Sequence, residues 1–539
     1  MSTADVLVVG AGPVGLVMAG ELARHGIKSR IVDQLTAPLP YCRALGVTPR
    51  TLEVWEDMGV AREALDAGIE LKGFRLEIEG KPPQDVLRDY ADLPYASLCL
   101  PQPETERILA RHLRTFGIEV ETGVRFTTAT PQGDHVAVTL ERNGATEEAA
   151  FRYVIGCDGA HSIVRRMAGI GFPGEAMPYD FMLGDVNVDL GLPRGVGLRF
   201  LRPKPNAAPD VIIAVPLPEP YRYRLTLLAP PELAAPGAGT DHGIQSERAK
   251  PTLAQLQAAI DRIAPGRGTL ADLRWSSLFR IGTRLADRYR AGNLFLAGDA
   301  AHIHPPTGGQ GMNTGIQDAY NLAWKMALVL KGSARPDLLD SYDLERRTEG
   351  ADVLARTTAA TRGITQRNQQ EDRLADTQLL VAYAPSPWIR DDASGTFSAT
   401  ARKPGQRAPD CRGLHRECVG FPFRLFEILR GTQHVLLVDV RESAPDKLAA
   451  LLALAAKLRT EFGDGITSNL RLIAIGPNPA ETQPGLTWLE DREHQFQQIY
   501  AGHDSAAWLV RPDGYIAWRG AGDFTEQFIA YLRVIFESQ

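Results

Sequence analysis

The chain has 539 residues, which is enough for two or three domains with substantial cores. Its hydrophobic content of 44%, charged content of 23% and formal charge of −6 are typical of a globular protein, and they disfavour nucleic acid or an anionic membrane as the main partner. Five scattered cysteines without metal-ligand spacing, no basic signal-peptide region and no apolar run of bilayer length predict a cytoplasmic protein.

The first elements predict a nucleotide-binding βαβ unit. A buried strand over residues 5–9 is followed by the glycine motif GAGPVG at residues 10–15, and a second strand over 28–32 ends in Asp33. The motif alone could be a simple glycine-rich turn. Because the strand, the helix and the acid are all in register, we expect a ligand that carries ADP with a free ribose, such as FAD or NAD.

The next segments connect this unit to a different kind of structure. A loop over residues 41–50 carries Arg43 and Arg50 near the carboxyl end of the predicted sheet, where ligands bind, although solvated surface arginines are an equal alternative. Residues 73–100 are predicted as short antiparallel strands, and residues 102–112 as a helix. Short strands are expected over 119–121 and 136–140.

A second acid follows the strand over residues 154–157, at Asp158, and Gly159 comes next. From residue 179 to 228 the alternation of apolar and polar residues predicts an antiparallel sheet with one wet face. A helix is expected over 253–263. This β block is the predicted place for a second, smaller substrate.

The stretch from residue 292 to 332 predicts a ligand site. A short strand leads to Asp299, a loop is stiffened by Pro305 and Pro306, and a glycine-rich turn opens a helix that ends near residue 330. Unpaired N–H groups and the positive end of the helix dipole should face an electron-rich ligand, and Asp299 suits a polyol hydroxyl. Reduced flavin combines a polyol chain with an anionic ring.

The C-terminal part is predicted to be helical from residue 336 to about 382 and then, after a linker over 402–412, to form a compact α/β domain. The expected strands of this domain are 434–438, 470–475, 506–510 and 515–519, and the expected helices are 446–462 and 525–536.

Three motifs, GAGPVG, GCDGAHSIVR and GDAAHIHPPTGGQGMN, resemble in order and spacing those of the FAD-dependent aromatic hydroxylases of the p-hydroxybenzoate hydroxylase type. The C-terminal domain resembles the thioredoxin-like domain of the phenol hydroxylase branch, which includes pentachlorophenol monooxygenase and polyketide-tailoring hydroxylases, but it has no Cys-x-x-Cys. The resemblance implies an α/β fold with three parts: a Rossmann-like FAD-binding domain (1–72, 101–175 and 276–400), an inserted antiparallel β substrate domain (73–100 and 176–275) and a thioredoxin-like α/β domain (401–539).

The resemblance also implies which residues contact FAD, with Asp33 standing where the family usually has Glu. They are Gly10, Gly12, Pro13, Val14, Gly15, Asp33, Gln34, Arg43, Ala44, Gln102, Arg107, Asp158, Gly159, Gly298, Asp299, Pro306, Gly308, Gly311, Met312 and Asn313.

The implied activity is that of a monooxygenase. NADPH or NADH reduces FAD, O2 gives a flavin C4a-hydroperoxide, and a hydroxyl group is transferred to a phenolic or polycyclic aromatic substrate. The catalytic candidates are the Pro305 carbonyl, Tyr223 and Arg222, with Tyr179 beside them; packing or surface roles are the competing interpretation for each. His302 and His304 have the spacing of a metal pair but no third ligand, so no metal is expected.

Other functions remain open at this level. An FAD-binding pathway protein that stabilises an intermediate without hydroxylating it is the main alternative. A flavin halogenase is disfavoured because the Trp-x-Trp-x-Ile-Pro signature is absent, and a plain NAD dehydrogenase leaves the GDAAH loop unexplained. A homodimer is one oligomeric state compatible with the hypothesis.

Overall fold

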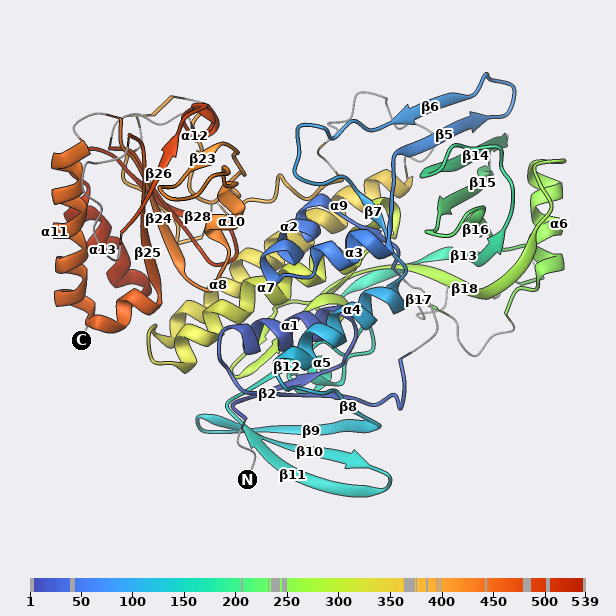
Figure 1. Ribbon diagram of the computed structural model, residues 1–539. Coiled ribbons are helices and arrows are strands. Elements are labelled where there is room, and N and C mark those ends of the chain that lie inside the picture. The colour runs from blue at the N-terminus through green and yellow to red at the C-terminus, as the bar shows by residue number, and fades with distance from the viewer. Residues whose placement is uncertain are drawn as a thin grey trace. The chain divides into compact units, whose positions relative to one another are not determined.

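The computed structural model (Figure 1) describes residues 4–38, 44–204, 207–230, 232–233, 243–244, 250–362, 374, 376–383, 386–393, 395, 397–398, 400–441, 444–477, 486–500 and 505–536. The chain divides into two compact units: Met1–Ala23 with Lys28–Ala319 and Arg347–Gln378, and Arg24–Ile27 with Tyr320–Arg346 and Leu379–Gln539. Within these described ranges no helix is long and apolar enough to cross a membrane.

The first unit contains a six-stranded sheet with the strand order β19-β20-β12-β1-β2-β8. Its strand β1 (Val6–Val9) pairs in parallel with β12 (Tyr153–Gly156) on one side and β2 (Ser29–Asp33) on the other. All four side chains of β1 are buried, as expected for a parallel strand covered on both faces. The predicted βαβ unit is therefore confirmed. The other strands are β8 (Glu121–Thr122), β19 (Arg290–Ala291) and β20 (Leu294–Leu296).

The helices of this unit include those that begin at the predicted ligand site. They are α1 (Pro13–Arg24), α2 (Pro49–Met58), α3 (Ala61–Ala67), α4 (Gln102–Thr115), α5 (Ile163–Met167), α6 (Leu253–Ile263), α9 (Thr348–Arg362) and the first half of α7 (Gln310–Leu330).

A nine-stranded sheet also belongs to this unit, and it confirms the predicted antiparallel strands over residues 179–228. The predicted wet face is wrong at Arg222 and Arg224, which are buried. The strand order of this sheet is β17-β18-β13-β16-β15-β14-β5-β6, with β21 paired to β18. The strands are β5 (Gly73–Ile78), β6 (Gln84–Leu87), β13 (Gly174–Asn187), β14 (Val196–Lys204), β15 (Ala207–Pro216), β16 (Arg222–Leu228), β17 (Gly243–Ile244), β18 (Ala271–Leu285) and β21 (His302–Ile303). The predicted domain boundary at residue 275 falls inside β18.

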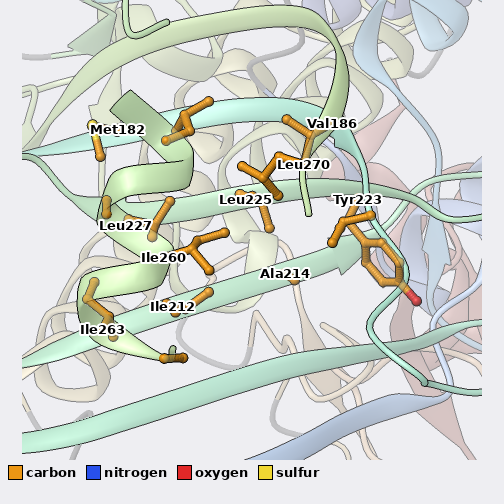
Figure 2. Packing of buried hydrophobic residues seen from close by; sticks show 14 of the residues in the cluster. Met182, Val186, Ile212, Ala214, Tyr223, Leu225, Leu227, Ile260, Ile263 and Leu270 are labelled. Atoms are coloured by element: carbon orange, nitrogen blue, oxygen red, sulfur yellow. The ribbon is translucent and has the colours of Figure 1, made fainter. Parts of the chain in front are cut away.

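One face of this sheet packs against α6 and forms a hydrophobic core (Figure 2). Helix α6 begins with a capping box between Thr252 and Gln255, and it buries Leu256, Ile260 and Ile263 against the sheet. Burying each such side chain contributes about 1.5–3 kcal/mol. This face is therefore closed.

Alternate residues on the same strands point to the opposite face of the sheet, which we call the open face. Phe181, Leu228 and Phe279 lie in one row across β16, β13 and β18, and all three are only half-buried. Leu183 and Ile213, also half-buried, belong to the next row. The first row is apolar, whereas the second also contains Thr226 and Ser277. The row after that carries the ion pair between Asp185 and Arg224, so the open face is apolar at one end and polar at the other.

Two smaller sheets complete the first unit. An antiparallel sheet consists of β9 (Val124–Gln132), β10 (His135–Arg142) and β11 (Ala145–Phe151), of which only part of β10 was predicted. Polar residues dominate β11, so its sequence lacks a strand-like apolar pattern, whereas the alternation in β9 is limited to its first few residues. The other sheet has the order β3-β7-β4 and comprises Gly46–Val47, Leu98–Cys99 and Ile69–Glu70.

The second unit contains a seven-stranded mixed sheet with the order β22-β28-β27-β24-β25-β26-β23. The four predicted strands and two predicted helices are confirmed, whereas β26 and α12 were missed. The thioredoxin-like character remains a prediction. Bounds are β22 (Arg390–Asp391), β23 (Leu414–His415), β24 (His434–Asp439), β25 (Leu470–Ile475), β26 (Thr487–Asp491), β27 (Ala507–Val510), β28 (Ile516–Gly520), α8 (Asp340–Tyr342), α10 (Leu425–Leu429), α11 (Ala444–Phe462), α12 (Gln495–Tyr500) and α13 (Thr525–Ile535).

The prediction that helices continue to about residue 382 is wrong over residues 376–382. Helix α9 ends at Arg362, and residues 376–383 are turns with a β-bridge at Ala382. The apolar residues of this segment, such as Leu379 and Val381, are buried by tertiary contacts rather than by a helical face.

A buried ionic cluster lies in the second unit. Glu345 accepts hydrogen bonds from Lys325 at 2.8 Å, Asn321 at 2.9 Å and Arg511 at 2.8 Å, and Arg511 also pairs with Asp513. Burial of these charged side chains is nearly complete. The cluster joins α7 to the turn between β27 and β28.

Candidate active site

The glycine motif forms the predicted tight turn between β1 and α1. Gly10 has a φ of +99°, and a Cβ atom there would overlap the Cys157 carbonyl. A Cβ atom on Gly15 would overlap the Gly10 carbonyl, so the helix and strand are in close contact. By contrast, no atom lies within 4 Å of a Cβ position on Gly12. Space for a ligand therefore exists at the middle glycine, where a pyrophosphate approaches in this motif.

Asp33 stabilises this turn directly. Its Oδ2 accepts a hydrogen bond from the Ala11 N–H at 2.7 Å, and its Oδ1 accepts one from the Leu35 N–H at 2.8 Å. The carboxylate is half-buried, and Gln34 beside it is exposed. The shorter acid in place of Glu therefore still reaches the glycine loop.

Asp158 lies at the carboxyl end of β12, as predicted, but its main contacts are structural. Oδ2 accepts hydrogen bonds from the N–H groups of Ile163 (2.6 Å) and Val164 (3.2 Å) at the start of α5. Oδ1 is buried and has no partner among the described residues. Burial raises the pKa of this carboxyl group, and the hydrogen bonds oppose that shift. Its unpartnered oxygen is suited to a donor on a ligand.

Arg165 connects two of the motifs and was not singled out by sequence. It is buried and donates to the carbonyls of Ala300 at 2.8 Å and Ala160 at 2.9 Å, while its guanidinium stacks on Phe172. Burial lowers the pKa of Arg165 to about 10, so it remains charged at neutral pH. The sequence did contain a sign of this role, because an arginine within an apolar helical turn is expected to need a buried hydrogen-bonding partner.

The third motif packs tightly against the first. Gly298 has a φ of +64°, and a Cβ atom there would lie 2.9 Å from Cγ2 of Val14 at the start of α1. A Cβ atom on Gly315 of α7 would lie 2.6 Å from the same methyl group. Asp299 follows this turn and is exposed. The N-terminal regions of two helices and the Asp299 turn thus meet at one place, as the polyol hypothesis requires.

His302 and His304 are not arranged as a metal pair. The His302 Nε2 lies 2.7 Å from the Asp318 Oδ2 of α7, and the two imidazoles stack with ring centroids 5.8 Å apart. Burial lowers the pKa of His304 to about 3, so this ring is neutral. In the part of the chain that is described, no group of three or more His, Cys, Asp or Glu side chains could hold a metal.

The loop that opens α7 is connected to the segment around Gly46. The buried Asn313 amide donates to the carbonyls of Gly46 (2.8 Å) and Gly309 (2.6 Å) and accepts from the Thr48 N–H (3.0 Å). The first N–H groups of an α-helix have no partners within the helix, so those of α7 are the groups expected to face a ligand. Asn313 therefore holds the loop, and a direct contact of its side chain with the flavin ring is not required.

Other residues predicted to contact FAD lie in or beside the same loops. Gln102 accepts a hydrogen bond from the Ala44 N–H at 3.0 Å through its side chain. Pro305 is buried, whereas Pro306 and Gly308 are exposed. The remaining predicted contacts, Pro13, Val14, Gly159, Gly311 and Met312, lie within or beside these turns.

Two arginines, Arg107 and Arg43, are also predicted to contact FAD. Arg107 is at the surface, where its guanidinium pairs with Glu104 at 2.7 Å and Glu63 at 3.0 Å. These ion pairs occupy its guanidinium, and its contact with the cofactor remains a prediction. Arg43 and the side chain of Tyr179 lie outside the described residues.

The structure also separates the catalytic candidates of β16. Tyr223 is buried as a member of the hydrophobic cluster that packs against α6, and it lies at one edge of that cluster in Figure 2. Arg222 is committed to Asp272, donating to its carbonyl at 2.6 Å and pairing with its carboxylate. A strand places consecutive side chains on opposite faces, so these two residues cannot act together, and a catalytic role for Tyr223 is not supported. Pro305 and Arg222 remain predictions.

The open face is joined to the FAD loop. Strand β21 pairs with β18 through Ile303 and Arg284, immediately before Pro305. A small cluster packs Val215 of β15 against Leu45, the neighbour of Gly46. The nine-stranded sheet therefore continues into the loop that opens α7.

The geometry defines a dinucleotide site of the FAD type. Three motifs far apart in sequence contact one another, because Gly10 meets Cys157, Val14 meets Gly298 and Gly315, and Arg165 binds Ala300. The open space at Gly12, the acid at 33 and the exposed acid at 299 are the space and acceptors expected of a site for ADP and a ribityl chain.

Comparison with known proteins agrees with this class. Residues 3–357 match the model of the FAD binding domain family, and residues 401–538 match that of the aromatic-ring hydroxylase C-terminal family. The 6-methylpretetramide 4-monooxygenase of Streptomyces rimosus is 31% identical over 98% of this chain and 93% of its own. The pentachlorophenol 4-monooxygenase of Sphingobium chlorophenolicum is 30% identical over 98% and 97%. A crystal structure of aklavinone-11 hydroxylase with FAD and aklavinone has 26% identity, a TM-score of 0.76 and 99% coverage of both chains.

The chain belongs to the FAD-dependent aromatic-ring monooxygenases, and its cofactor is FAD. The predicted α/β fold with an FAD-binding domain is confirmed, and so is the predicted FAD cofactor.

Proposed function

We propose that this monooxygenase hydroxylates a polycyclic phenolic substrate that lies on the open face beside the FAD loop. One oxygen atom of O2 enters an aromatic C–H bond and the other leaves as water, while NADPH or NADH supplies the two electrons. Bound FAD supplies the oxygen-activating chemistry. The observation that carries the proposal is the half-buried apolar row Phe181, Leu228 and Phe279, on a sheet that hydrogen-bonds to the FAD loop.

The chain's own groups would then bind and orient the substrate. Phe181 and Phe279 offer aromatic area to a flat molecule and keep water away. The Pro305 carbonyl, which has two lone pairs, can accept the phenolic O–H in addition to its contact with His304 at 3.3 Å. The first N–H groups of α7 and Asp299 would hold FAD.

The names of related enzymes support a substrate with several fused rings. The 6-methylpretetramide and aklavinone enzymes are named for polycyclic molecules, whereas the pentachlorophenol enzyme is named for a single ring. Apolar residues of the open face come from four strands, because Leu228, Phe181 and Phe279 form one row and Ile213 and Leu183 lie in the next, and this extent favours several fused rings.

The test is a screen of polycyclic and simple phenols for faster NADPH and NADH oxidation, with mass spectrometry for a gain of one oxygen atom. Phe181→Ala should raise KM for an accepted polycycle by about tenfold, because the lost aromatic contact is worth about 1–1.5 kcal/mol. The control is Leu87→Ala, on the exposed strand β6. If no phenol accelerates oxidation or gains oxygen, the hydroxylase assignment fails and a non-hydroxylating FAD protein is favoured.

The oligomeric state and location belong to the same proposal. We expect a cytosolic protein that uses O2 as co-substrate, and a homodimer is to be tested by light scattering. The described cysteines, Cys99, Cys157, Cys411 and Cys418, are all free thiols, which suits a reducing compartment. Recovery with the membrane fraction of a lysate would contradict this location.

A further inference from the structure

Gln378 has an unusual backbone conformation in a buried position. Its φ is +61°, in the left-handed region that favours glycine, and its side chain is only 3% exposed. A glycine would adopt this conformation without steric cost. The presence of a glutamine therefore needs a reason in its side chain.

The side chain of Gln378 hydrogen-bonds to the first turns of α7. Its Nε2 donates to the Thr314 hydroxyl at 2.9 Å, and its Oε1 accepts from the Gln317 Nε2 at 2.7 Å. The Thr48 hydroxyl, at the start of α2, also donates to Oε1, at 3.3 Å. One amide thus bridges the N-terminal regions of two helices.

These partners lead directly to the FAD loop. Thr48 donates its N–H to Asn313, whose amide holds the carbonyls of Gly46 and Gly309. Gln378 is therefore linked through Thr48 to Asn313, the side chain that joins the Gly46 segment to the loop before α7.

The backbone around Gln378 is fixed from other sides. The Thr377 carbonyl accepts from the Arg50 N–H at 3.2 Å, and the Asp376 carbonyl accepts from the Gln310 Nε2 at 3.1 Å. The Asp376 carboxylate pairs with Arg88 at 2.6 Å. These contacts stabilise the left-handed turn so that it can present the amide.

We infer that Gln378 is a positioning residue of the FAD site: its amide fixes the first turns of α7 and Asn313, and hence the direction of the N–H groups that face the flavin. The inference rests on the FAD assignment and not on the identity of the aromatic substrate. A residue kept only for the turn would be replaced by glycine without loss, and this difference gives the test.

The decisive variant is Gln378→Gly, which relaxes the backbone and deletes the amide. We expect FAD to dissociate with a Kd about tenfold higher, because buried hydrogen bonds are lost, and the visible spectrum of the bound flavin to shift. Thr314→Val, which removes one hydrogen-bonding partner, should shift both quantities in the same direction by less.

The matched control is Asn143→Gly. Asn143 also has a positive φ, of +51°, but it is exposed in the turn between β10 and β11. This change should leave the FAD Kd and spectrum unaltered. If Gln378→Gly has the wild-type Kd and flavin spectrum, whatever happens to its melting temperature, the inference is overturned. No aromatic substrate enters these measurements, so a failed substrate screen would not affect them.

Discussion

The His302 imidazole and the Asp318 carboxylate form a fully buried pair with 2.7 Å between Nε2 and Oδ2. The same Oδ2 accepts the Gly298 N–H at 3.1 Å, so one carboxylate oxygen of α7 holds both ends of the GDAAH turn. This pairing fixes the turn that carries Asp299 relative to α7, whose first N–H groups we propose to face FAD.

Asp318→Asn should therefore weaken FAD binding. The asparagine amide keeps the shape of the side chain but lacks the negative charge to which Gly298 and His302 both hydrogen-bond. Hydrogen bonds to charged groups are worth about 1.5–3 kcal/mol. We expect at least a tenfold rise in the FAD Kd, measured by flavin fluorescence quenching. Asp134→Asn, at a carboxylate that is 94% exposed, is the control, and an unchanged Kd for Asp318→Asn would refute this role.

Asp299→Ala should give colourless or weakly coloured protein. In the proposed site the exposed carboxylate would accept hydrogen bonds from ribityl hydroxyls, and alanine removes that acceptor. The ratio of absorbance at flavin and protein wavelengths measures the effect, and Asp299→Asn should retain part of the colour. A fully yellow Asp299→Ala protein with normal turnover would contradict the assignment.

Gly315→Ala should destabilise the first unit by about 1–3 kcal/mol, because the new methyl group would lie 2.6 Å from Val14 and 2.9 Å from the Gly298 Cα. Bound FAD should be lost at lower temperature. The control is Gly420→Ala, because no atom lies within 4 Å of a Cβ at that position. Thermal unfolding is monitored through the release of flavin. Equal melting temperatures for both variants would show that the contact is not tight.

His434→Phe should reduce the acid sensitivity of the protein. Burial, and secondarily the charge of Arg511, lowers the pKa of His434 to about 3, while the unfolded chain protonates this residue near pH 6.5. Stability is therefore full above pH 6.5 and falls by about 1.4 kcal/mol per pH unit as the pH decreases toward 3. Phenylalanine keeps the edge-to-face contacts with Trp324 and Phe536.

The measurement for His434→Phe is urea unfolding at pH 7, 6 and 5. The variant should lose less stability than the wild type over this range, although the neutral His304 also contributes to the slope. Parallel pH profiles would show that His434 is protonated in the folded state.

Glu345→Ala should destabilise the second unit more than Lys325→Met. Removing the glutamate leaves Lys325 and Arg511 buried near each other with less compensation, a change that typically costs about 3–5 kcal/mol. Removing the lysine leaves Glu345 paired with Arg511. Chemical denaturation of the full chain compares the two, and the reverse order would be inconsistent with this charge balance.

Many strands, helices and turns of this fold could be predicted from the sequence because they depend on residues close together in the chain. The strand, glycine turn and acid at residues 5–33, and the strand, proline loop and helix at 292–332, each follow from periodicity and turn chemistry over a short window. The FAD cofactor followed from these two stretches together with Asp158. Strands such as β11 were missed because polar edge strands carry little periodic signal.

Other features were decided only by tertiary structure. The two faces of β16 assign Tyr223 to the core and Arg222 to Asp272, and a sequence shows alternation without showing which face α6 covers. Gln378 lies in a turn that the sequence predicted as helix, and its partners Thr48 and Thr314 are distant along the chain. Local chemistry thus determined the cofactor and its turns, whereas long-range packing determined which side chains hold them in place.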